Sequence, residues 1–305
     1  MRFDMTILRR RLFEWLAAAA IAACTILVGL PSSADVLHQE RSLYRNITIY
    51  EEDGLRCMAF GRNFKARQSC MSLAKHDELV FNYLRMAMGA LYLNASPRSI
   101  LIIGLGGGTL PMTFQRLFPD AKIDTVEIDP AVVRVAKRFF EFAPGPNMQV
   151  FEEDGRVFVK RTMRGASKYD LIILDAFDHE YIPEHMLTRE FLLEVKSLLT
   201  PEGVLVGNTF STSKLYDHES ATYYSVFGDF YNLKKNNRLI IWRQGGLPSK
   251  ADLARNGDAL DAKLAPFGVD KAWLLPQFEI ERNWPADTRV LTDQYSPSNV
   301  LNAQH

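Results

Sequence analysis

Four glycines and a series of acidic residues carry the chemistry that this sequence offers. The glycines follow an apolar run and precede a helix-like stretch; they are Gly104, Gly106, Gly107 and Gly108. Glycine lets the backbone turn sharply and approach a ligand closely. Glu127 ends the next apolar run about twenty residues later, where a carboxylate can accept hydrogen bonds from ribose hydroxyls. This order of strand, glycine turn, helix and acid predicts a nucleoside site.

The glycine turn has two alternative interpretations. It can be a structural turn that binds nothing, or a NAD-type fingerprint, which requires glycines at the first, third and sixth positions. The sixth position counted from Gly104 is Thr109, so the pattern is G-x-G-G-G. That pattern is typical of a turn beneath an adenosyl sulfonium, which has no pyrophosphate for the helix N-terminus to bind.

Further acids end the strands that follow. Asp154 comes after MQVFEE, Asp175 comes directly after LIIL, and Asp178 follows shortly. Ligands of open α/β sheets bind beyond the carboxyl ends of the strands. Asp154, with Gly155 behind it, can accept a hydrogen bond from an adenine amino group or can cap the next helix. The Asp175 carboxylate is expected to point into the cleft, near the reacting carbon.

The rest of the pattern supplies elements that would position these residues. Alternation and turn signals over residues 40–70 predict a small antiparallel β-domain, and apolar spacing predicts a helix over 76–93. From Ser99 onward, strands and helices alternate regularly, which is typical of a mostly parallel α/β sheet. We therefore expect four parts, a leader (1–34), the β-domain (35–75), the nucleoside-binding domain (76–245), and a C-terminal helix and tail packed on it (246–305).

The N-terminus has the composition of a targeting segment. Arg9, Arg10 and Arg11 precede an apolar stretch over 16–30, and small residues follow it. This order predicts a cleaved export signal. An uncleaved anchor and a lipid-modified Cys24 are the alternatives. With a signal or an anchor the folded domain lies across the membrane, on the periplasmic side, and touches the membrane only through this segment; without a working signal it is cytoplasmic.

Charge and cysteine usage narrow the partners and the compartment. The 305 residues include 36 basic and 36 acidic side chains, and such balance argues against a general nucleic-acid binder. Cys57 and Cys70 flank a predicted hairpin that turns near Gly61, so a bridge between them is geometrically possible. Such a bridge would contribute on the order of 3 kcal/mol and would persist only in an oxidising compartment. The alternative is two buried thiols.

The order of glycine-rich loop, EID, DG and a D-x-x-D element resembles the spermidine synthases, the polyamine aminopropyltransferases, over about Arg45 to Gly245. The resemblance implies a Rossmann-like, class I methyltransferase-like sheet and decarboxylated S-adenosylmethionine as donor substrate. It implies that Glu127 binds ribose, Asp154 binds adenine, Asp175 is the base or amine-holding acid, and Asp178 grips the ammonium of a small amine. The family often forms dimers, so the resemblance makes a homodimer possible, but the sequence does not determine the oligomeric state.

This sequence departs from the family pattern around both substrates. Gly107 stands where the family has an aspartate that holds the donor's amino group, so ordinary S-adenosylmethionine is also a candidate donor. Phe81 and Asn82 replace the substrate-contacting tyrosine and its polar neighbour. We therefore expect an acceptor other than plain putrescine. Asp293 and Tyr295, in the C-terminal tail, are candidate substrate contacts.

Three functions follow from these residues. The first is aminopropyl transfer, the second is methyl transfer from the intact nucleoside, and the third is an exported, non-catalytic protein that binds a nucleoside or a polyamine. A metal site is not expected, because the residues that suggest one sit in a loop that enters a helix beside Pro183. Those residues are His179, Glu180, Glu184 and His185.

Overall fold

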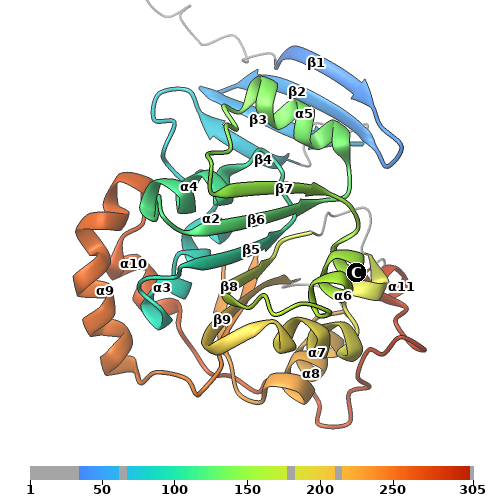
Figure 1. The fold of residues 1–305 in the computed structure, drawn as a ribbon, viewed down its shortest axis with the longest axis vertical. Coiled ribbons are helices and arrows are strands. Elements are labelled where there is room, and N and C mark those ends of the chain that lie inside the picture. The colour runs from blue at the N-terminus through green and yellow to red at the C-terminus, as the bar shows by residue number, and fades with distance from the viewer. Residues whose placement is uncertain (1–33, 62–66, 177–182, 210–214, 236, 303–305) are drawn as a thin grey trace, which may run out of the picture. The chain divides into compact units, whose positions relative to one another are not determined.

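The computed structural model describes residues 34–61, 67–176, 183–209, 215–235 and 237–302 (Figure 1). From Val36 onward, the described residues belong to one compact unit. The expected signal or anchor lies outside the described residues. Within the described part, no helix has the length and apolar character needed to span a membrane. The predicted boundaries at residues 75 and 245 stay predictions.

A seven-stranded sheet forms the centre of the unit, in the order β10-β11-β9-β8-β5-β6-β7. The five strands from β9 to β7 run parallel, and β10 and β11 are antiparallel to their neighbours. The strands are β5 (Ser99–Ile103), β6 (Lys122–Glu127), β7 (Met148–Glu152), β8 (Tyr169–Leu174), β9 (Leu199–Thr209), β10 (Tyr231–Lys234) and β11 (Arg238–Arg243). The predicted α/β class with a mostly parallel sheet is confirmed.

Helices cover both faces of this sheet, which is why β5 and β8 read as continuous apolar runs (Figure 1). One face packs against α2 (Asn82–Ala87), α3 (Ala90–Leu93), α4 (Thr109–Leu117), α9 (Lys250–Leu264) and α10 (Lys271–Leu274). The other face packs against α6 (Gly155–Thr162), α7 (Arg189–Ser197) and α8 (Leu215–Phe227). A short helix, α11 (Ser298–Asn302), ends the described chain.

The single helix predicted over 76–93 is wrong. The structure has two short helices, α2 and α3, and the first begins only at Asn82 because Phe81 is extended, with φ −88° and ψ 141°. Gly89 separates them and lies against Phe278, which would be 2.7 Å from a Cβ at that position. Apolar spacing predicted one continuous helix, whereas the chain forms helical turns only from Asn82 and is divided at Met88 and Gly89.

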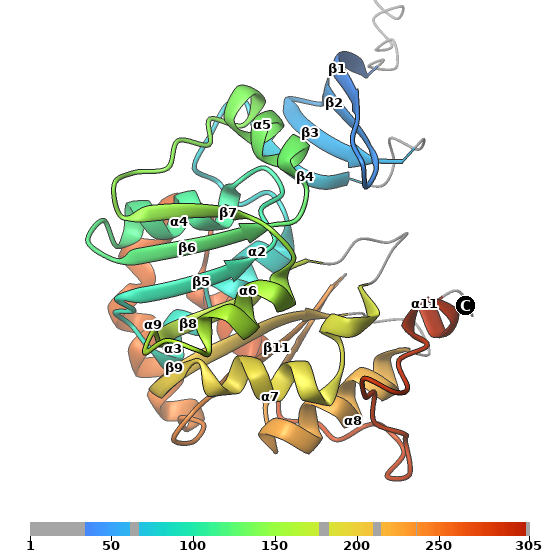
Figure 2. The same cartoon turned by 45° about the vertical axis from the view of Figure 1, so that its right-hand side comes forward.

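A second, four-stranded sheet precedes the main one, in the order β1-β2-β3-β4. Its strands are β1 (Asp35–Arg41), β2 (Asn46–Glu52), β3 (Leu55–Phe60) and β4 (Arg67–Ser72). Ile47, Ile49 and Met58 share a cluster with residues of α5 (Pro130–Phe139), so this sheet packs on that helix (Figure 2). The small N-terminal antiparallel β-domain is therefore confirmed.

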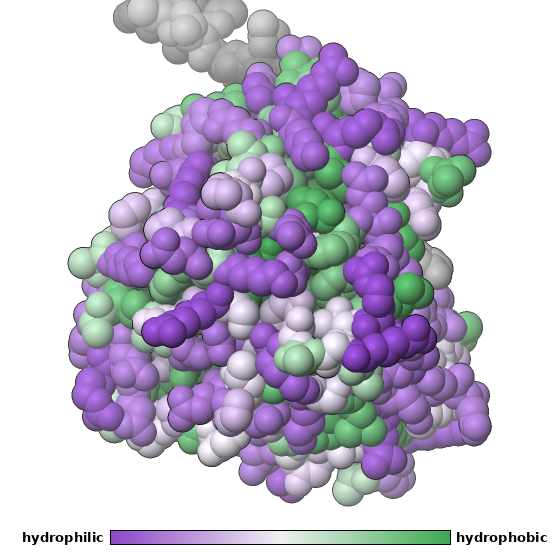
Figure 3. Space-filling view, in the orientation of Figure 1, coloured by the Kyte–Doolittle hydropathy of each residue, from purple (hydrophilic) through white to green (hydrophobic). Residues whose placement is uncertain are grey.

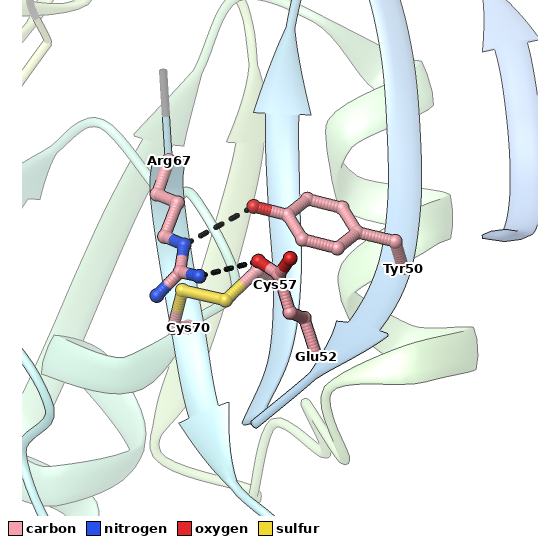
Figure 4. Close-up of a disulfide and its surroundings, with 5 residues drawn as sticks. All are labelled: Tyr50, Glu52, Cys57, Arg67 and Cys70. Atoms are coloured by element: carbon pink, nitrogen blue, oxygen red, sulfur yellow. Dashed lines mark hydrogen bonds and ion pairs between the residues drawn. A yellow bond between two sulfur atoms is a disulfide. The ribbon is translucent and has the colours of Figure 1, made fainter. Parts of the chain in front are cut away.

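A disulfide joins the two central cysteines of this small sheet (Figure 4). Cys57 on β3 and Cys70 on β4 are directly opposite in the antiparallel register, with their Cα atoms 4.1 Å apart. Both side chains are buried. The predicted bridge is present.

On the outside, the face of the molecule seen in Figure 3 is largely hydrophilic, with apolar groups in small scattered areas.

Candidate active site

The glycine turn connects β5 to α4 and brings the ends of two strands together. Gly104, Gly106 and Gly108 have φ of +105°, +53° and +83°, a region that favours glycine. A Cβ on Gly104 would lie 2.1 Å from the carbonyl oxygen of Asp175, so only glycine fits between β5 and β8 here. The turn therefore packs its backbone directly against the first residue beyond β8.

Gly107 is restricted by its neighbours rather than by its dihedral angles. A Cβ on Gly107 would lie 2.7 Å from the Ser69 hydroxyl oxygen and 3.0 Å from the Phe140 ring. Ser69 is a buried residue of β4. A serine from the small sheet thus lies where a side chain at position 107 would begin, and an aspartate there would have to displace it.

Glu127 ends β6 and accepts two backbone hydrogen bonds at the same turn. One carboxylate oxygen accepts from the Leu105 amide at 3.1 Å and the other from the Asp129 amide at 2.9 Å. Burial raises the pKa of Glu127, and the two amide donors oppose that rise. A carboxylate has about four lone-pair sites, so two further donors, such as ribose hydroxyls, can still bind. The structure thus brings Glu127 and the glycine turn together.

Asp175 follows β8 and is held by two side chains from distant parts of the chain. The Tyr83 hydroxyl donates to Oδ2 at 3.2 Å, and the Asn208 amide nitrogen donates to Oδ1 at 2.8 Å. Burial raises the pKa of Asp175 to about 6, although both hydrogen bonds act in the opposite direction. A partly buried carboxylate with such a pKa is suited to accept a proton near neutral pH.

Tyr83 and Asn208 are functional candidates that sequence reasoning missed. Tyr83 lies on α2 and fits the apolar helical spacing, so nothing local distinguishes its hydroxyl. Asn208 is the penultimate residue of β9, and a polar residue at the carboxyl end of a central strand was the available signal. In the described part of the chain, its side-chain oxygen Oδ1 is buried and accepts no hydrogen bond.

Phe81 and Asn82, the two residues predicted to contact the acceptor substrate, directly precede Tyr83 in the chain. Phe81 is the N-cap residue of α2, and its ring stacks on Tyr83 with a centroid separation of 6.0 Å. Asn82 is the first residue of the helix. The ring of Phe81 is therefore linked to Asp175 through a single intervening side chain.

Asp154 caps α6 and also binds a histidine. Its Oδ1 accepts from the amides of Arg156 and Val157, at 2.9 and 3.0 Å, and its Oδ2 contacts His185 Nε2 at 2.9 Å. The hydrogen bond from His185 is the main reason that the pKa of Asp154 is lowered. The capping alternative is thus observed, and adenine binding stays a prediction. Gly155 allows α6 to approach β5, since a Cβ would lie 2.6 Å from Ile103.

The C-terminal tail residues have partners of their own. The Arg156 guanidinium donates to Asp293, and the Thr188 hydroxyl donates to the same carboxylate at 2.7 Å. Tyr295 packs under Arg289, whose guanidinium carbon is 3.4 Å from the ring centroid. The contact of the tail residues with substrate therefore stays a prediction.

Asp178 lies outside the described residues, as do His179 and Glu180. The structure does describe Glu184, which accepts a hydrogen bond from Asn299, and His185, which contacts Asp154. No cluster of three or more His, Cys, Asp or Glu suited to a metal ion occurs among the residues that the structure places.

These features define a class of protein, namely a Rossmann-like α/β protein with a glycine turn and carboxylates at the carboxyl ends of its parallel strands. The Spermine/spermidine synthase domain matches residues 81–232. A polyamine aminopropyltransferase of Vibrio vulnificus is 45% identical over 285 residues, which cover 91% of this chain and 95% of that protein. The chain belongs to the polyamine aminopropyltransferase (spermine/spermidine synthase) family and is a transferase.

Two solved structures agree with this fold. Human methyltransferase-like protein 13 in complex with SAH has a TM-score of 0.55 and 27% identity, covering 70% of this chain and 99% of that one. A probable spermidine synthase from Corynebacterium glutamicum has a TM-score of 0.62 and 18% identity, covering 83% and 98%. The second likeness concerns the fold alone.

Proposed function

We propose that the protein transfers an aminopropyl group from decarboxylated S-adenosylmethionine to a small amine at the carboxyl edge of the main sheet. The observation that supports this most is the position of Asp175. Its backbone touches the glycine turn at Gly104, and its carboxylate is held by Tyr83 and Asn208. The family supports aminopropyl transfer as the reaction.

In this proposal Asp175 prepares the acceptor amine for attack. An alkylammonium has a pKa of about 10, so losing its proton at neutral pH costs about 4 kcal/mol. The Asp175 carboxylate accepts that proton directly. Its pKa of about 6 is closer to the pKa of the alkylammonium than an ordinary carboxyl pKa is, so the proton transfer costs less free energy. The amine nitrogen then bonds to the carbon beside the sulfonium, the carbon–sulfur bond breaks, and the sulfur leaves as a neutral thioether.

The donor side uses groups that accept hydrogen bonds. Glu127 would bind the ribose hydroxyls with the lone pairs that Leu105 and Asp129 leave free. The Asp154 carboxylate would accept a hydrogen bond from the adenine amino group through a lone pair that the contact with His185 leaves free. Carboxylates at this edge of the sheet suit a donor and an acceptor that are both cationic.

For the acceptor, we propose an amine other than plain putrescine. Phe81 brings an apolar ring next to Tyr83, at a position where the family pattern has a substrate-contacting tyrosine. Asp178 is proposed to hold the acceptor ammonium. Purified protein should therefore form spermidine poorly, and rapid spermidine formation from putrescine would refute this part of the proposal.

A second candidate reaction is methyl transfer from intact S-adenosylmethionine. The Ser69 hydroxyl lies where an acidic side chain at position 107 would begin. The side of the glycine turn at Gly107 therefore carries no negative charge that would repel the carboxylate of intact S-adenosylmethionine. Calorimetry with both donor forms separates the candidates. Tighter binding of the decarboxylated form supports aminopropyl transfer, and tighter binding of the intact form supports methylation.

We further propose that the folded domain acts on the outer side of the cytoplasmic membrane. The buried Cys57–Cys70 bridge supports this, because disulfides persist in oxidising compartments. Fractionation with cysteine labelling tests it. Labelled, reduced cysteines in a cytoplasmic fraction would contradict the proposal.

A further inference from the structure

The strand that carries Cys70 forms a wall of the glycine turn. Ser69, the residue before Cys70, would be 2.7 Å from a Cβ on Gly107 and 3.6 Å from one on Gly106. Cys70 itself lines a hollow together with Gly108 and Thr109, the end of the turn and the start of α4. The turn is therefore supported from outside the main sheet by β4.

This supporting strand is an edge strand. In the order β1-β2-β3-β4, β4 pairs only with β3. Its attachment includes the β3–β4 hydrogen bonds, the packing of Met71 in the cluster shared with α5, the Cys57–Cys70 bond, and the side chain of Arg67, which donates to Glu52 at 2.6 Å and Tyr50 at 3.2 Å (Figure 4). An edge strand is paired along one side only, so it is held by fewer backbone hydrogen bonds than a central strand of the same length. The disulfide is thus the covalent constraint at this edge.

We propose that the Cys57–Cys70 disulfide is a redox-sensitive brace for the donor site. With the bridge formed, β4 holds the glycine turn in its binding conformation. With the bridge reduced, the strand and the turn sample more conformations, and the donor must order them when it binds. This inference rests on the proposed function, in that the turn is taken to bind the donor.

The switching step is thiol–disulfide exchange with a dithiol. One thiolate of the reductant attacks a sulfur of the bridge and forms a mixed disulfide, releasing one cysteine as a thiolate. The second thiol of the reductant then attacks the mixed disulfide and releases the other cysteine. The bridge gains two electrons and two protons, and the reductant becomes a disulfide. Because both cysteines are buried, the exchange requires local opening of the edge strand.

Donor binding before and after reduction tests the brace. The full chain carrying Cys24→Ser is titrated with decarboxylated S-adenosylmethionine in its oxidised form, after dithiothreitol, and after reoxidation. We expect reduction to raise Kd about tenfold, equivalent to about 1.4 kcal/mol, and reoxidation to restore it. The double variant Cys57→Ser/Cys70→Ser should bind like the reduced protein and should not respond to dithiothreitol. Equal affinities in a sample whose alkylated peptides prove the reduction would overturn the proposal.

Hydrogen exchange without ligand gives a second, donor-independent measurement. Reduction should speed exchange of the amides over residues 105–109, while the amides of β8 should stay unchanged as an internal control. Unchanged exchange in the turn would overturn the brace. A different result would refute the proposed function itself: the turn of the oxidised protein exchanges slowly, yet the protein binds neither donor form. In that case the proposed effect of the disulfide on donor binding would be refuted as well.

Discussion

Replacing Asp175 by asparagine removes the proposed base and keeps most of the shape of the site. The new side chain can accept from the Asn208 amide with its oxygen and donate to the Tyr83 hydroxyl oxygen with its nitrogen, but it cannot take a proton from an ammonium. General-base catalysis typically contributes 10²- to 10⁴-fold, so we expect kcat to fall by about that factor. The Kd of the donor should change by less than about threefold, because Asp175 is assigned to the acceptor.

The pH profile provides a sharper form of the same prediction. Because burial raises the pKa of Asp175 to about 6, kcat/KM of the unchanged enzyme should rise with pH through about 6. The ionised fraction is about one tenth at pH 5 and about nine tenths at pH 7. Asp175→Asn should lack this limb. Initial rates from pH 5 to 8 measure it.

The same carboxyl group should reduce stability at neutral pH. Its folded pKa lies above the unfolded value, so the folded state binds more protons between about pH 4 and 6 and the free energy of unfolding falls as pH rises through that window. The difference between about 6 and the ordinary 3.8 corresponds to about 3 kcal/mol at full burial, and partial exposure reduces it to on the order of 2 kcal/mol. Asp175→Asn should be more stable by about that amount at pH 7 and by almost nothing below pH 4, in urea unfolding.

Asp170→Asn is the matched control. Asp170 lies on the same strand and accepts hydrogen bonds from the amides of Arg98 and Ser99, at the opposite end of the sheet. This variant should lose stability and keep its kcat. If Asp175→Asn kept kcat within about threefold, or if the control lost as much activity, the role given to Asp175 would be refuted.

Three further predictions concern the neighbours of this group. Tyr83→Phe removes a hydrogen bond that lowers the pKa of Asp175, so the rising limb of kcat/KM should move above pH 6 and kcat should fall up to about tenfold; an unmoved limb would contradict the contact. Glu127→Gln should raise the donor Kd about ten- to a hundredfold by calorimetry, with little change in the acceptor KM, whereas an unchanged donor Kd would exclude Glu127 from the ribose site. Reduction of the Cys57–Cys70 bridge should lower the free energy of unfolding by about 3 kcal/mol in urea, and no loss would show that the bridge carries no stabilisation.

Features encoded over short stretches were predictable from the sequence. Glu127 reaches the glycine turn because β5 and β6 are adjacent parallel strands joined by one helix, and that order is visible in the chain. The disulfide follows from two cysteines that face each other across one hairpin. The regular alternation of strands and helices from Ser99 onward predicted the mostly parallel sheet.

Features that depend on distant packing were not predictable. Tyr83 and Asp175 are 92 positions apart, and only the folded core brings the hydroxyl to the carboxylate. Asn208 reaches the same carboxylate from another strand. Gly89, between α2 and α3, packs so closely against Phe278, far along the chain, that a Cβ would lie 2.7 Å from its ring. Local periodicity carries no signal for such contacts.

Product analysis of the purified full chain tests the central claim most directly. The protein is incubated with decarboxylated S-adenosylmethionine and a panel of small amines that includes putrescine, and the products are identified by mass spectrometry. We predict one aminopropylated amine, formed together with an equal amount of 5′-methylthioadenosine, and formed about 10²- to 10⁴-fold more slowly by Asp175→Asn. A methylated amine formed from intact S-adenosylmethionine, with no aminopropylated product from the decarboxylated donor, would contradict the account.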